Sequence, residues 1–165
     1  MREMSETEKA WLAAAIDGEG SLCFIKHYNV KHGGYARGYG YRSQLSVANC
    51  CKAFVDRVKE IIGGGIVGQV GKSPLFKDGT KMAKPGYRYD GRAMVLRSVL
   101  IQVYPYLIIK RRQAELLIEA LVLLSEHHHK YHPNDARLEE IYAEIKRLNS
   151  KGTAITPRVR FKGGC

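Results

Sequence analysis

The sequence lacks any apolar run long enough to cross a membrane, and its N-terminus lacks the apolar core of a secretory leader. A spanning helix needs about 18 or more consecutive apolar residues, and a leader needs a shorter apolar stretch behind positive charges. We therefore expect a protein that is not secreted and that has no membrane partner.

Cysteine is also scarce in this chain. The four cysteines are Cys23, Cys50, Cys51 and Cys165, and no two of them form a C-x-x-C pair. Cys50 and Cys51 are adjacent, so their side chains point to different sides of any regular element. This usage indicates an intracellular, reducing compartment, either the cytoplasm or an organelle.

Acidic residues are few beside the basic ones, because 27 Lys and Arg outnumber 16 Asp and Glu and leave a formal net charge of +11. An excess of this size favours a polyanionic partner, above all nucleic acid. A hydrophobic content of 45% with mixed charge is typical of a folded domain. We expect one domain over 1–150 and a basic, mobile tail over 151–165.

The spacing of apolar residues predicts the element order α-β-β-α-β-β-α-α-α. Helices are predicted over 6–17, 50–62, 91–103, 110–129 and 135–149, and strands over 20–29, 39–48, 66–71 and 86–90. Ser5 and Glu8 form a capping box at the first helix, Gly63 ends the second helix, and Asp90 is expected to cap the third. This order predicts an α+β fold with a four-stranded antiparallel sheet and helices on one face.

The second predicted strand alternates between polar and apolar side chains. Arg42, Gln44 and Ser46 lie on one face, and Leu45 and Val47 lie on the other. Since helices cover the apolar face, the polar face is left for a ligand. A twisted β-ribbon can enter the major groove of DNA, where Arg can read guanine and Gln can read adenine. The residues by themselves therefore predict a DNA reader built on a sheet.

The first predicted helix carries two further features. Ala10, Ala14 and Gly18 are spaced four apart on one face, which would let a second helix approach closely. Asp17 and Glu19 lie at the C-terminal end, where the helix dipole disfavours carboxylates. A carboxylate held there between two glycines is a candidate metal ligand, although a solvated acidic turn explains the same residues.

The segment 12–20, L-A-A-A-I-D-G-E-G, resembles the nine-residue signature of the LAGLIDADG homing endonucleases. The residues that match its letters are Leu12, Ala13, Ile16, Asp17 and Gly20. Glu19 stands where the signature ends in Asp, and Glu also occurs there in active relatives. The segment 104–114, Y-P-Y-L-I-I-K-R-R-Q-A, is similar to the family's P-[FY]-L-x-x-K-x-x-Q-A segment. The resemblance covers roughly 8–125 and contains one signature, as in the single-motif homodimeric members.

The resemblance implies the αββαββα fold of this family, with a curved antiparallel sheet, and the activity of a site-specific DNA endonuclease encoded in an intron. It implies that Glu19 and the carbonyl of Gly18 hold Mg²⁺ or another divalent cation such as Mn²⁺. It also implies that Lys110 lies near the scissile phosphates and that Asn49 positions water. Asp17 is expected to be a structural residue at the helix end.

A single chain supplies only one Glu19, so we expect a C2 homodimer through Ala10, Ala14 and Gly18 that brings two copies of Glu19 together. The expected product is a staggered double-strand break with 3′ overhangs in a long, near-palindromic target. An RNA-binding intron maturase and a non-cleaving DNA-binding protein of the same fold remain alternatives.

The candidate DNA contacts share polar or basic side chains on the predicted strands and loops. They are Ser21, His27, Asn29, Arg42, Gln44, Ser46, Lys72 and Arg88. Both faces of the strands over 20–29 and 86–90 contain apolar residues, so the pattern does not decide which face meets DNA. Five tyrosines could stack on bases, namely Tyr35, Tyr39, Tyr41, Tyr87 and Tyr89, but packing in the sheet is favoured for them.

Overall fold

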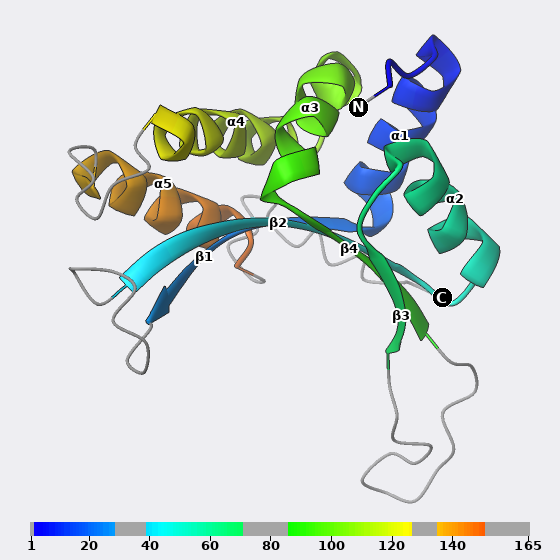
Figure 1. Ribbon diagram of the computed structural model, residues 1–165, viewed down its shortest axis with the longest axis horizontal. Coiled ribbons are helices and arrows are strands. Elements are labelled where there is room, and N and C mark those ends of the chain that lie inside the picture. Colours follow the sequence, from blue (N-terminus) through cyan, green and yellow to red (C-terminus); the bar gives the residue numbers. More distant parts are fainter. Residues whose placement is uncertain (1, 29–38, 71–85, 127–134, 151–165) are drawn as a thin grey trace, which may run out of the picture.

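The computed structural model describes residues 2–28, 39–70, 86–126 and 135–150 (Figure 1). Its helices are α1 Glu6–Glu19, α2 Lys52–Ile62, α3 Ala93–Val103, α4 Arg111–Glu126 and α5 Asp135–Leu148, and its strands are β1 Gly20–Tyr28, β2 Tyr39–Asn49, β3 Ile66–Val70 and β4 Gly86–Arg92. A short 3₁₀ helix, η1 Tyr104–Tyr106, connects α3 to α4. The predicted order of helices and strands is confirmed.

The four strands form one antiparallel sheet in the order β1-β2-β4-β3, so two hairpins meet at the central pair β2 and β4. The sheet is strongly curved, and the helices lie along its convex side (Figure 1). Curvature of this kind arises from the twist that each strand carries. The predicted α+β class, with a curved sheet covered by helices on one face, is confirmed.

The strand register assigns every described strand residue to one of two faces. Gln44 lies opposite Cys23 of β1 and Arg92 of β4, while Ser46 lies opposite Ser21 and Asp90. Paired residues of antiparallel strands share a face, and successive residues alternate between faces. The register therefore settles the question that the alternation pattern left open for β1 and β4.

The convex face of the sheet forms the core with the helices. Leu22, Leu45, Val47 and Tyr89 are almost fully buried there, and the apolar faces of all five helices add further core residues. Tyr41 is 8% exposed and Tyr89 is 1% exposed. Both tyrosines pack against helices, as predicted; Tyr35, another of the five tyrosines, lies outside the described residues.

Most of the predicted helix boundaries have the expected local cause. Ser5 and Glu8 form both hydrogen bonds of the capping box at α1. Gly63 ends α2 with a φ of 73°, a left-handed conformation that glycine adopts without strain. The predicted role of Asp90 is wrong, because this residue lies within β4 and α3 begins at Ala93.

Three of the four cysteines fall in the described part of the chain, and all three are free thiols. Among the same residues, no helix is both long and apolar enough to span a bilayer. The predicted basic tail over 151–165 lies outside the described residues, and the predicted extent of the domain stays a prediction.

One buried polar group invites a test of the core. Ser43 is 0% exposed on the helix side of β2, and its hydroxyl has no hydrogen-bond partner among the described residues. An unpaired buried hydroxyl costs free energy, so Ser43→Ala should raise the free energy of unfolding by about 1 kcal/mol. Urea unfolding measures this change. As a control, Ser46→Ala should lower the free energy of unfolding, because the Ser46 hydroxyl donates to Asp90. A lower free energy of unfolding for Ser43→Ala would show that the buried Ser43 hydroxyl does not destabilise the protein.

Candidate catalytic site and nucleic-acid interface

Glu19 is the last residue of α1, and β1 begins at the next residue without a linker. The backbone N–H of Gly20 donates to the carbonyl of Ile16, and a Cβ at Gly20 would lie 2.5 Å from that oxygen. Only glycine therefore fits this turn. The Glu19 side chain is exposed and forms no hydrogen bond or ion pair with any residue that the structure describes. The turn thus presents a free carboxylate at the end of the sheet.

Asp17, two residues earlier, has the opposite environment. Its Oδ2 accepts from the backbone N–H groups of Ile108 and Ile109 at 2.7 and 3.1 Å, and its Oδ1 accepts from that of Lys110 at 2.9 Å. Partial burial raises the pKa of the Asp17 carboxyl, but these three hydrogen bonds outweigh it and leave the pKa below its ordinary value. Asp17 therefore fixes the start of α4 to the end of α1, as a structural residue does.

The same contact places Lys110 beside the free carboxylate. The Lys110 ammonium donates to the backbone carbonyl of Asp17 and is partly buried. Burial lowers the pKa of Lys110, while the negative charges of Asp17 and Glu19 oppose that shift. Glu19 and Lys110 are 91 residues apart in the sequence, and the fold brings them close enough for the charge of Glu19 to act on Lys110.

Replacing Asp17 tests this connection. Asp17→Asn should lower the free energy of unfolding by about 2 kcal/mol at neutral pH, because three backbone donors lose a charged acceptor. Since the pKa of Asp17 in the folded protein lies below 3.8, its stabilising effect is complete above that pH and is lost as the pH falls through the folded value.

The difference between the wild type and Asp17→Asn should therefore narrow progressively below pH 3.8. Urea unfolding at pH 7 and at successive steps below pH 3.8 measures it. Asp56→Asn is the control, because among the described residues Asp56 pairs only with Lys52, on the exposed side of α2. A difference that stayed constant with pH would count against the role of the carboxylate.

Asn49, the third predicted catalytic residue, ends β2. Its Oδ1 accepts a hydrogen bond from the backbone N–H of Cys51 at 2.8 Å, which shapes the turn into α2. Val47 pairs with Gly20, so Asn49 lies at the end of β2 that adjoins the α1–β1 turn. No described hydrogen bond joins Asn49 to Glu19 or Lys110, and its role stays a prediction.

The predicted dimer surface is open in the single chain. Ala10, Ala14 and Gly18 are all exposed along one face of α1, and a Cβ at Gly18 would meet nothing within 4 Å. Nothing inside the described chain thus requires small side chains at these positions. Ile108 and Ile109 are 85% and 70% exposed and are held to this same helix by Asp17. These residues together form an exposed apolar surface.

The concave face of the sheet carries most of the predicted DNA contacts. The register places six of them on it, namely Ser21, His27, Arg42, Gln44, Ser46 and Arg88. No described helix covers this face (Figure 1). Asn29 and Lys72, which were also predicted to contact DNA, lie outside the described residues.

Asp90 is the polar residue on this face that the sequence argument placed wrongly. Its carboxylate accepts hydrogen bonds from Gln44, Ser46 and Arg88. The sequence signal for Asp90 is the alternation of polar and aromatic residues in Tyr87-Arg88-Tyr89-Asp90. This alternation includes Asp90, which is typical of a strand residue and not of a helix cap.

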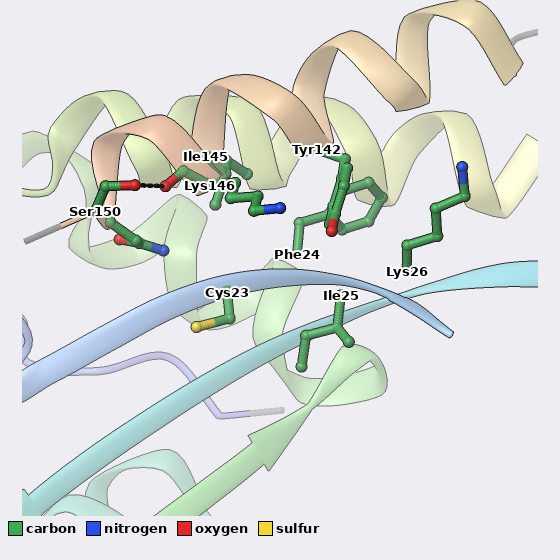
Figure 2. A pocket seen from close by; sticks show the side chains of 9 residues that line it. Cys23, Phe24, Ile25, Lys26, Tyr142, Ile145, Lys146 and Ser150 are labelled. Carbon is green, nitrogen blue, oxygen red and sulfur yellow. Dashed lines mark hydrogen bonds between the residues drawn. The ribbon is translucent and has the colours of Figure 1, made fainter. Parts of the chain in front are cut away.

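A separate hollow lies at the outer edge of β1, beside α5. It has a volume of about 400 Å³, and its walls include Phe24, Tyr142 and Ile145, with Lys146 nearby (Figure 2). The lining of the hollow begins at Cys23, four residues after Glu19 along the extended β1. Neither Glu19 nor Lys110 lines the hollow. The hollow is therefore separate from the candidate catalytic site.

The five described helices and the curved, four-stranded antiparallel sheet match the fold of solved LAGLIDADG homing endonucleases. The chain therefore has the fold of that class, and the predicted resemblance is confirmed at the level of the fold. No protein-family model matches the sequence, and no curated protein matches it.

Three of these structures show the extent of the similarity. The archaeal intron-encoded homing endonuclease I-Vdi141I, in complex with DNA, has a TM-score of 0.70 and 17% identity over 92% of this chain and 90% of that chain. I-CvuI in complex with the I-CreI target has a TM-score of 0.66 and 20% identity over 92% and 87% of the two chains. I-SmaMI, bound to an uncleaved DNA target with calcium ions, has a TM-score of 0.68 and 18% identity over 87% of this chain and 46% of that longer chain.

Proposed function

We propose that the protein is a homing endonuclease, encoded in an intron, that makes a staggered double-strand break with 3′ overhangs in a long, near-palindromic DNA site. The observation that carries this proposal is the unpartnered Glu19 carboxylate next to Lys110, at the edge of a polar sheet face. Homing endonucleases with the same fold have been solved in complex with DNA, which supports the same substrate here.

The concave face supports recognition of duplex DNA. Arg42 and Arg88 are exposed on it, and the polar Gln44 and Ser46 lie between them in the register. A curved β-ribbon of this kind fits the major groove, where each base pair presents a distinct set of donors and acceptors. The formal net charge of +11 supplies attraction to phosphates, so binding should weaken steeply as salt is added.

The donor set at the α1–β1 turn suits a hard divalent cation, Mg²⁺ or Mn²⁺. Glu19 offers a carboxylate without a competing partner, and the backbone carbonyl of Gly18 offers a second oxygen. A bound cation would supply an activated water, neutralisation of the phosphoryl charge and stabilisation of the leaving oxygen. I-CvuI has been solved with DNA in 2 mM Mg and in 2 mM Ca, which is consistent with a divalent cation in this class.

The chain's own residues then have distinct tasks. Lys110, held by the Asp17 carbonyl, carries positive charge towards the scissile phosphate and lowers the cost of the developing negative charge. Asp17 fixes the position of that lysine relative to Glu19. Asn49 orients water at the adjoining end of β2.

Cleavage of both strands requires two such sites, whereas one chain carries one Glu19. We place them in a C2 homodimer in which the two α1 helices pack through Ala10, Ala14 and Gly18. The exposure of these small residues, and the exposed Ile108 and Ile109 next to them, supports this surface. The axis of the pair would bring the two copies of Glu19 together under the duplex.

Cleavage of a plasmid that carries the intronless junction of the host gene tests the proposal. The wild type should convert it to linear DNA with 3′ overhangs in Mg²⁺ and should leave it intact in EDTA. Binding without cleavage in either condition would favour the non-cleaving DNA-binding protein, and selective binding of intron RNA would favour the maturase.

A further inference from the structure

Asp90 is an acidic residue in the middle of a face that must meet a polyanion. Its Oδ1 accepts from Gln44 Nε2 at 2.8 Å and from Ser46 Oγ at 2.6 Å, and its Oδ2 accepts from Arg88 Nε at 2.8 Å. Gln44 Nε2 also donates to Ser46 Oγ at 3.1 Å. One carboxylate on β4 therefore holds two side chains of β2 and one of its own strand.

These contacts determine which hydrogen-bond donors and acceptors Gln44 and Arg88 can present to DNA. An ionised carboxylate only accepts hydrogen bonds, so the amide nitrogen of Gln44 must face Asp90 and its carbonyl oxygen must face away. Gln44 can then accept a hydrogen bond but has no free amide N–H for the N7 atom of a purine. Arg88 uses Nε on Asp90 and keeps both terminal nitrogens for the paired acceptors O6 and N7 of guanine.

We propose that Asp90 is a positioning residue that sets the base preference of the concave face. With Asp90 in place, Gln44 selects a base that carries an exocyclic amino group in the major groove, adenine or cytosine, and Arg88 selects guanine. This inference rests on the proposed recognition of duplex DNA by this face. The base specificity of Gln44 and Arg88 would then depend on Asp90.

Asp90 does not serve as a phosphate contact or a direct reader in this arrangement. Both of its oxygens already accept from protein donors, and a carboxylate repels phosphate. Partial burial raises the pKa of Asp90, and the hydrogen bonds from Ser46, Gln44 and Arg88 outweigh that effect, so its pKa lies below the ordinary value. The carboxylate therefore stays ionised at neutral pH and keeps its three donors.

Selection of bound sequences from a pool of randomised duplex DNA, in EDTA, tests the inference. The wild type defines a base preference at each position of the site. Gln44→Ala and Arg88→Ala identify the positions that those two side chains read. Asp90→Asn then replaces one accepting oxygen by an amino group of nearly the same size, and Asp56→Asn on α2 is the matched control for the change of charge.

Asp90→Asn should reduce base discrimination about 10-fold at the positions identified by Gln44→Ala and Arg88→Ala, and at no others. The dependence of binding on salt should stay as in the wild type, because no phosphate contact is lost. Asp56→Asn should leave the whole preference profile unchanged.

Three results would overturn the inference. The first is a wild-type profile from Asp90→Asn, and the second is a uniform loss of affinity across all positions. The third is a change at a position that neither Gln44→Ala nor Arg88→Ala affects, because Asp90 would then read a base itself. If Asp90→Asn does not fold, Ser46→Ala removes one donor of the same cluster. It should alter the base preference at the position that Gln44→Ala identifies, and an unaltered preference there would overturn the inference. A wild type without any base preference would instead refute the proposed function.

Discussion

Glu19→Gln is expected to reduce DNA cleavage by about 1,000-fold or more, while the variant binds duplex DNA at least as tightly as the wild type. The amide has nearly the same shape as the carboxylate but carries no charge to hold a divalent cation. Glu19 has no described partner within the chain, so its replacement should not affect folding. Single-turnover cleavage in Mg²⁺ and a gel-shift titration in EDTA measure the two effects separately.

Glu140→Gln is the matched control, because Glu140 lies on the exposed side of α5 and Arg137 is its only ion-pair partner in the described part of the chain. This variant should cleave at the wild-type rate. If Glu19→Gln cleaved at the wild-type rate as well, the assignment of the catalytic carboxylate would be wrong. If it lost binding together with cleavage, Glu19 would have a role in recognition that the geometry does not explain.

Ala14→Arg is expected to weaken self-association by about 100-fold or more and to abolish double-strand cleavage. Ala14 is exposed in the single chain, so an arginine fits without disturbing the core. In a symmetric pair, however, two arginines would meet across the axis, where they clash and repel each other. Sedimentation velocity over a range of concentrations gives the association constant, and plasmid cleavage gives the activity.

Ala143→Arg on the exposed side of α5 introduces the same charge at a site remote from α1 and should leave both measurements unchanged. A dimer that persisted in Ala14→Arg would show that the small residues of α1 do not form the interface. A monomeric Ala14→Arg that still cut both strands efficiently would show that the two active sites need no shared axis.

The fold could be predicted from the sequence where local rules decide the structure. The capping box at Ser5 and Glu8 and the glycine at position 63 determine helix ends through bonds within a few residues. The alternation of β2 from Gln44 to Val47 identifies its two faces because the polar Gln44 and Ser46 alternate with the apolar Leu45 and Val47. The small residues of α1 likewise lie opposite the buried Leu12 and Ile16, as helical spacing requires.

The remainder depends on contacts between distant residues. Asp17 binds backbone groups more than 90 residues away. The sequence predicts its structural role, but no local pattern indicates which distant groups it binds. The face of β1 that is proposed to meet DNA follows from its pairing with β2, since both of its faces carry apolar side chains. Asp90 was misplaced for a related reason, because an aspartate before an apolar run fits a helix cap as well as a strand.

The direct passage from α1 into β1 has a consequence for how such a protein can change its target. Because Gly20 alone separates Glu19 from Ser21, the backbone would fix the distance between the proposed scission point and the first proposed base contact. In the proposed enzyme, side chains along the strands could therefore be exchanged without moving the cut. One extra residue in that passage would turn every side chain of β1 to the opposite surface.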